Sequence, residues 1–184
     1  QMVADMAGIG RKQAKTVNLG IMYGMGKAKL ANTLDLSAKA LTMPSGAVLQ
    51  VVVDTTETEI ANNTTSEVAT GLSASITPSS SSSKVLALVT LPIQRGSNSG
   101  NIEVGYYLKR GSTVIATGRS KVNVNAIVQL HDYVSLSKLD LPSTTSATTY
   151  SVTFKELVQT NRYGSTMVCS DGSTATLTLM EIAG

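Results

Sequence analysis

The chain has little of several residue types, and each shortage narrows what it can be. Its 184 residues include no tryptophan, one phenylalanine, one histidine and one cysteine. The single cysteine, Cys169, excludes an intrachain disulfide and a cysteine-based zinc site, so we expect it to be a buried thiol. A catalytic triad would have to use His131, and no Gly-x-Ser-x-Gly turn marks a nucleophile. We therefore predict no enzyme, no catalytic residues, no metal site and no cofactor.

The sequence also lacks long apolar runs. No stretch approaches the roughly 20 apolar residues that a membrane-spanning helix needs, so we expect a soluble protein without membrane insertion. At the N-terminus Arg11, Lys12 and Lys15 interrupt the chain before an apolar core forms, which is unlike a secretory signal.

The net positive charge of the chain comes from its first segment. Residues 1–40 hold six basic and two acidic residues, whereas the remainder holds nine basic and ten acidic ones. Ala14, Val17, Ile21 and Met25 follow the spacing of one helical face, although several glycines weaken that helix. We predict a basic helical arm over 1–36, a linker over 37–46 and a β domain over 47–184. The arm would need a neighbouring surface for stability.

The second segment has the pattern of short strands between turns. In residues 68–76, Leu72, Ala74 and Ile76 alternate with serines, and clusters of Pro, Gly, Asn and Ser separate further apolar runs. The expected strands are 48–53, 68–76, 85–89, 102–108, 114–117, 122–130, 150–158 and 174–182. Such a series predicts a mainly β protein, an antiparallel jelly-roll-like β-sandwich whose core is filled by aliphatic residues.

Two of these runs are apolar on both faces, which an isolated sandwich does not need. Val51-Val52-Val53 and Leu86-Ala87-Leu88-Val89 leave no polar side for water. We therefore expect part of the outer face to meet another subunit, with a homotrimer as the natural hypothesis.

The β segment resembles a module of virion and tail-fibre proteins of aquatic tailed phages, cyanophages among them. The resemblance covers residues 43–184 and keeps the order of its pieces. These pieces are 43–52, 70–79, 83–86, 108–112, 143–150 and 177–183. It implies a virion protein with a structural or adhesion role. Its place would be a tail fibre, an appendage or a capsid decoration. The partners it implies are copies of itself, other virion proteins and a host-surface glycan or protein.

The first segment resembles a different family. Residues 2–36 contain the spacing of the fingers-helix motif of family A DNA polymerases, with a basic pair followed by an apolar position and a Tyr-Gly. The matching residues are Arg11, Lys15, Leu19 and Tyr23. The resemblance implies that the basic pair would meet the triphosphate of a nucleotide, with the other two positions near base and sugar.

Polymerase chemistry also needs palm carboxylates that hold two Mg²⁺ ions. His131-Asp132 follows an apolar run as that motif would, but Tyr133 replaces its glutamate. The alternative that remains is a non-catalytic fragment or fusion of a family A polymerase, and we do not expect a nucleic-acid partner.

A recognition surface, if the domain has one, would lie on its longer loops. The predicted loops are 95–101 and 161–165. Arg and Tyr side chains are frequent anchors at interfaces. The residues selected on this basis are Arg95, Asn98, Asn161, Arg162 and Tyr163. The other interpretation is that these loops only close hairpins.

Overall fold

The computed structural model describes Lys15, residues 44–159 and residues 165–184; of residues 96–100, 124–128 and 159 it describes the backbone alone. The chain divides into two units, Gln1–Pro44 and Ser45–Gly184. Lys15 is helical and exposed, and the rest of the predicted helical arm lies outside the described residues. The predicted division into arm, linker and β domain therefore stays a prediction.

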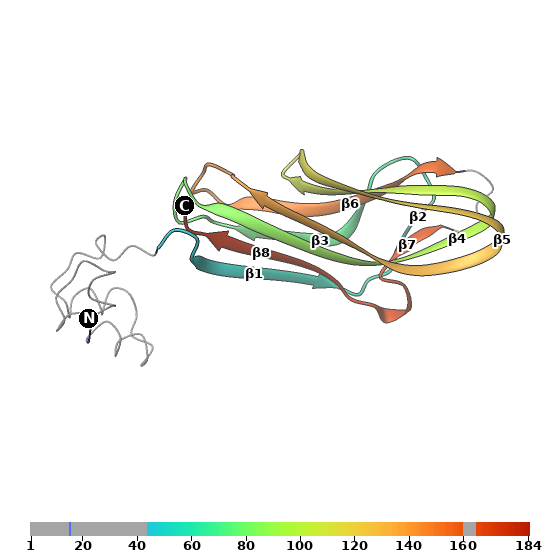
Figure 1. Ribbon diagram of the computed structural model, residues 1–184, viewed down its shortest axis with the longest axis horizontal. Coiled ribbons are helices and arrows are strands. Elements are labelled where there is room, and N and C mark those ends of the chain that lie inside the picture. Colours follow the sequence, from blue (N-terminus) through green and yellow to red (C-terminus); the bar gives the residue numbers. More distant parts are fainter. Residues whose placement is uncertain (1–14, 16–43, 160–164) are drawn as a thin grey trace. The chain divides into compact units, whose positions relative to one another are not determined.

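The described part of the second unit consists of antiparallel strands and one short 3₁₀ turn. The strands are β1 (Val48–Thr56), β2 (Ile60–Asn62), β3 (Val68–Ile76), β4 (Lys84–Arg110), β5 (Thr113–Asp140), β6 (Thr148–Gln159), β7 (Thr166–Val168) and β8 (Ala175–Ile182). The turn η2 spans Ser170–Gly172, between β7 and β8. The predicted antiparallel β-sandwich is confirmed (Figure 1).

Two very long strands, β4 and β5, belong to both layers of the sandwich. The first half of β4 pairs with β8 and with the second half of β5. Its second half pairs with β6 and with the first half of β5. We call the layer β1–β8–β4–β5 the first sheet and the layer β3–β6–β4–β5 the second sheet. Figure 1 shows the hairpin turning from one layer to the other at the end of the sandwich.

The bend at which this hairpin passes from one sheet to the other corrects one prediction. Residues 95–101 read as a loop because Gly, Ser and Asn dominate them, yet their backbone continues β4. Gly96 pairs with Gln129 and Asn98 with Ile127, and the register shifts between Asn98 and Gly100. A shift of this kind bends a strand without ending it, which is what the crossing between the two sheets requires.

The core follows the alternation of the strands. In β3, Leu72, Ala74 and Ile76 are buried while Ser73 and Ser75 are exposed, as predicted. The expectation of a purely aliphatic core is wrong, because Tyr106, Tyr150 and Phe154 are fully buried. Few aromatic residues are present, but the second sheet places three of them at its centre. Cys169 is a buried free thiol, as expected, and burial raises its pKa.

Gly71 allows a local irregularity in β3. Its φ is +89°, and the register between β3 and β6 shifts between Ala69 and Ser73. An L residue is strained at that φ, so Gly71→Ala should lower the free energy of unfolding by about 1–2 kcal/mol. Urea denaturation measures the loss, with Ser75→Ala on the exposed side of the same strand as the control. An unchanged stability in Gly71→Ala would contradict this account.

Candidate functional site

The residues that the sequence selected for recognition do not form one displayed surface. Arg95 is 4% exposed, because it lies on the same side of β4 as Leu91 and Ile93. Its Nη2 lies 3.5 Å from Asp132 Oδ2, and its Nε and Nη1 have no hydrogen-bond partner among the described residues. Arg95 is therefore not the exposed loop anchor that the sequence predicted.

The other selected residues are described only in part. The backbone of Asn98 pairs within the long hairpin, and its side chain is not described. Asn161, Arg162 and Tyr163 lie outside the described residues, as do Arg11, Leu19 and Tyr23 of the polymerase-like motif. Lys15 is exposed. Their roles in recognition or nucleotide contact stay predictions.

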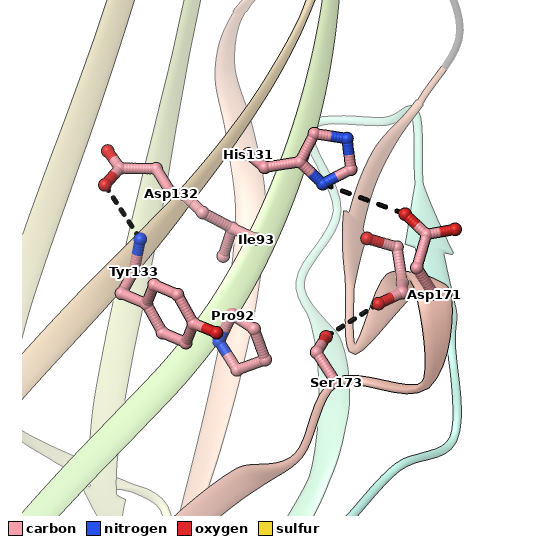
Figure 2. A pocket seen from close by; sticks show the side chains of 8 residues that line it. Pro92, Ile93, His131, Asp132, Tyr133, Asp171 and Ser173 are labelled. Carbon is pink, nitrogen blue, oxygen red and sulfur yellow. Dashed lines mark hydrogen bonds and ion pairs between the residues drawn. The ribbon is translucent and has the colours of Figure 1, made fainter.

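A shallow pocket opens where β4, β5 and η2 meet (Figure 2). Its volume is about 180 Å³. Residues from three distant stretches line it, which is why no single motif in the sequence marked it. The lining residues are Pro92, Ile93, His131, Asp132, Tyr133, Ser170, Asp171 and Ser173.

His131 is the centre of the polar contacts in this pocket. Its Nδ1 lies 3.8 Å from Asp171 Oδ2, and its Nε2 lies 3.2 Å from Gln94 Nε2. The predicted strand 122–130 ends just before this histidine, but His131 lies inside β5, paired with Gln94 of β4. The His131 and Asp171 side chains are mostly exposed, so the contact between them contributes little to stability.

Tyr133 provides an aromatic surface at the edge of the same pocket. Its side chain is 66% exposed and, in Figure 2, lies beside Pro92. Exposed rings next to carboxylates and hydroxyls are suited to ligands that have both apolar and hydroxylated faces. The pocket thus offers an aromatic ring and polar groups side by side on a shallow surface.

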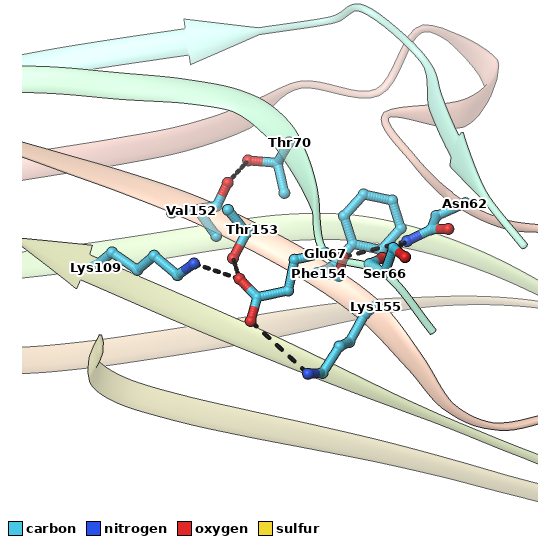
Figure 3. A network of polar contacts seen from close by, with 9 residues as sticks. All are labelled: Asn62, Ser66, Glu67, Thr70, Lys109, Val152, Thr153, Phe154 and Lys155. Atoms are coloured by element: carbon cyan, nitrogen blue, oxygen red, sulfur yellow. Dashed lines mark hydrogen bonds and ion pairs between the residues drawn. The ribbon is translucent and has the colours of Figure 1, made fainter. Parts of the chain in front are cut away.

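A second polar cluster, shown in Figure 3, surrounds Glu67 beside the second sheet. The Glu67 carboxylate accepts hydrogen bonds from Lys109 and from Thr153 Oγ1, the latter at 3.1 Å, and its Oε1 lies 3.8 Å from Lys155 Nζ. The hydrogen bond from Lys109 is the main reason that the pKa of Glu67 lies below its usual value. Lys155 also lies over the Tyr107 ring, 5.3 Å from its centroid. This cluster fastens the chain before β3 to β4 and β6.

Three buried carboxylates in the described residues also join separate segments. Glu181 accepts hydrogen bonds from Ser79 and Gln50, at 2.6–2.7 Å. Asp140 accepts from Arg110 at 2.8 Å and from the Tyr150 hydroxyl at 2.7 Å; burial and this hydrogen bond raise the pKa of Tyr150. Glu156 accepts from the Thr166 hydroxyl at 3.0 Å. In these contacts each carboxylate stabilises the fold.

The described residues contain no group of three or more His, Cys, Asp or Glu side chains placed to hold a metal ion. Within the same residues no helix has the length and apolar character needed to cross a membrane.

Comparison with known proteins gives one short sequence match and several distant structural ones. No family model matches the chain. A 36-residue stretch, 20% of the chain, is 61% identical to a DNA-directed DNA polymerase of Pseudomonas phage M6. The match spans only 5% of that polymerase. The predicted polymerase resemblance is thus confirmed for a short segment.

The solved structures similar to this chain include those of infectious bursal disease virus. Its T13 viral particle shares 14% identity and a TM-score of 0.42, over 75% of this chain and 32% of that one. The Gt strain shares 12% identity and a TM-score of 0.40, over 76% and 39%. A Bacillus endospore appendage shares 12% identity and a TM-score of 0.29, over 78% and 96%.

Proposed function

We propose that residues 43–184 form a structural domain of a tailed-phage particle, in a tail fibre, an appendage or a capsid decoration. The observation that carries the proposal is where the pieces of the phage-module resemblance lie in space. Gln50, Ser79 and Glu181 come from three separate pieces, and Glu181 accepts hydrogen bonds from the other two. Gly111 and Thr149 come from two more, and the Gly111 amide donates to the Thr149 carbonyl at 2.9 Å. Pieces that contact one another support a resemblance of the whole module.

The proposed domain acts by stiffness and by its surfaces, and not by catalysis. Its buried carboxylates hold loops and strands together, and its long hairpin links the two sheets covalently. The protein would assemble with copies of itself, in a trimer or another closed oligomer, and with other virion proteins. Its location would then be the virion.

Contact with the host surface is a finer part of the same proposal. The pocket at His131, Tyr133 and Asp171 supplies an exposed ring beside polar groups, which suits a glycan. Tyr133→Ala would then weaken binding of the domain to host cells without loss of folding.

The test of the proposed location uses particles of the phage that encodes the chain. Gradient-purified particles should contain peptides of residues 45–184 in fixed ratio to the major capsid protein, and antibodies against the domain should label them in electron microscopy. A protein found only in the lysate, absent from the particle, would refute the proposal.

The short match to the phage polymerase favours a second candidate, a non-catalytic fragment or fusion of a family A polymerase. The arm would in that case be a remnant of a fingers helix without its palm. Template-directed nucleotide incorporation should be undetectable under either candidate. Measurable synthesis would overturn both.

A further inference from the structure

The outward side of the first sheet carries one continuous apolar row that crosses all four of its strands, and beside it a row in which apolar and hydroxyl side chains alternate. The first row, aligned by strand pairing, consists of Val51, Met180, Leu86 and Leu139. Its two end members are about half exposed, Val51 at 53% and Leu139 at 51%. The adjacent row is Val53, Thr178, Leu88 and Ser137. In it Val53 is 56% and Leu88 is 37% exposed.

A third row continues this surface with hydroxyl groups alone. It consists of Thr55, Thr176, Thr90 and Ser135. None of the twelve positions in the three rows carries a charge. We call these three rows the neutral face.

The outward side of the second sheet is different. Lys109, Lys155 and Arg119 lie on it, together with the carboxylates of Glu67 and Glu103. Alternation therefore gives one layer a charged outer surface, as expected beside water. On the other layer the three rows carry no charge, and Lys84 lies one row beyond them. The contrast within one domain indicates that the neutral face has a partner.

We propose that the neutral face packs against the same face of a second copy of this chain, about a two-fold axis. This deepens the proposed function by naming the surface through which the domain assembles. A face without charge meets its own copy without like-charge repulsion, whereas the opposite surface would bring lysines against lysines. Aligned sheets pack well at about 10 Å, and the apolar residues of the first two rows supply the side chains for such a layer.

The size of the face fits a modest interface. Four strands about 4.8 Å apart and about six residues long, the extent of the three rows, cover about 400 Å², so two such faces remove about 800 Å² from water. This is below the roughly 1,000 Å² of a stable specific interface and is the size of a weak, transient one. The pairing is therefore reversible in solution and reinforced where many copies lie together.

The test uses the full chain in analytical ultracentrifugation across the micromolar range. The wild type should associate into even-numbered species, with little dependence on salt because the face is neutral. Leu88→Glu places two like charges near the axis and should raise the dissociation constant by about tenfold or more. Val114→Glu is the matched control, since Val114 is 43% exposed, opposite Lys109 on the second sheet, and should associate like the wild type.

Each other result counts against the proposal. A wild type that stays monomeric overturns it, as does Leu88→Glu associating normally or both variants dissociating alike. Ser137→Arg, which replaces an exposed polar side chain in the same row, repeats the test if Leu88→Glu does not fold. Failure here leaves the proposed virion location intact, because that is decided by the composition of purified particles.

Discussion

Replacing Phe154 with alanine is expected to lower the free energy of unfolding by about 4 kcal/mol. Phe154 is fully buried on β6, between Val68 of β3 and Tyr106 of β4 in the register of the second sheet. A truncation there removes a large apolar group and leaves a cavity that rigid strands fill poorly. Since the free energy of unfolding of a domain is about 5–15 kcal/mol, the variant should lose much of its stability.

Urea denaturation followed by circular dichroism measures the loss of stability, and two further variants serve as controls. Phe154→Leu keeps most of the volume and should cost about 1.5 kcal/mol or less. Tyr133→Ala removes an aromatic ring that is 66% exposed and should change stability by about 0.5 kcal/mol or less. If Phe154→Ala and Tyr133→Ala lose similar amounts, Phe154 is not at the centre of the core.

Glu181→Ala should lower the free energy of unfolding by about 3 kcal/mol, the second large loss. Glu181 is 1% exposed, and its carboxylate accepts hydrogen bonds from the Ser79 amide, the Ser79 hydroxyl and Gln50 Nε2. The variant leaves these donors near the ends of β1, β3 and β8 without their shared acceptor. Glu59→Gln changes an exposed carboxylate and should have an effect within about 0.5 kcal/mol.

The same carboxylate should contribute to acid sensitivity. Burial raises the pKa of Glu181, but the hydrogen bonds from Ser79 and Gln50 outweigh it, so the pKa in the fold lies below the usual value near 4.5. A depressed folded-state pKa gives stability that is present above the unfolded-state pKa and is lost as pH falls through the folded-state pKa. Stability of the wild type should therefore decline below about pH 4.5.

Glu181→Gln should decline less steeply in that range, while Glu59→Gln should follow the wild type. Unfolding curves in urea at several pH values between neutral and acidic conditions compare the three proteins. If the free energy of unfolding of Glu181→Gln falls as steeply with decreasing pH as that of the wild type, other carboxylates produce the acid sensitivity.

Local alternation made much of the sandwich predictable. Residues 68–76 form β3 at the predicted bounds, and Leu72, Ala74 and Ile76 are inside as predicted. The alternation of apolar and polar residues identifies a strand and its buried side without knowledge of the partner strand. The apolar character of Val51 and Leu88 was also visible, but its meaning depends on which residues pairing places beside them.

The errors came where distant pairing overrides local composition. Residues 95–101 have the composition of a turn, yet pairing with β5 keeps them in a strand. The three-residue strand β2 exists because Ile60 pairs with Val168, more than a hundred residues later. Such strands have no period long enough to detect.

The candidate site was missed for a related reason. The pocket joins Pro92, His131 and Asp171, which no sequence spacing connects, and Tyr133 was considered only as a departure from a polymerase motif. Register between β4 and β5 places His131 opposite Gln94, and the turn η2 brings Asp171 to it. The turn lies at Asp171 itself, but nothing near that residue in the sequence indicates that the turn contacts His131.

The pairing of the first strand with the last affects how the domain folds during synthesis. Gln50 and Glu181, joined by a hydrogen bond, are 131 residues apart in the chain. At roughly 5–20 residues per second, the ribosome completes β8 on the order of ten seconds after β1. Until then β1 has no partner in the first sheet, and its exposed valines can contact other nascent chains. Folding should therefore finish late and slowly, as long-range strand pairing requires.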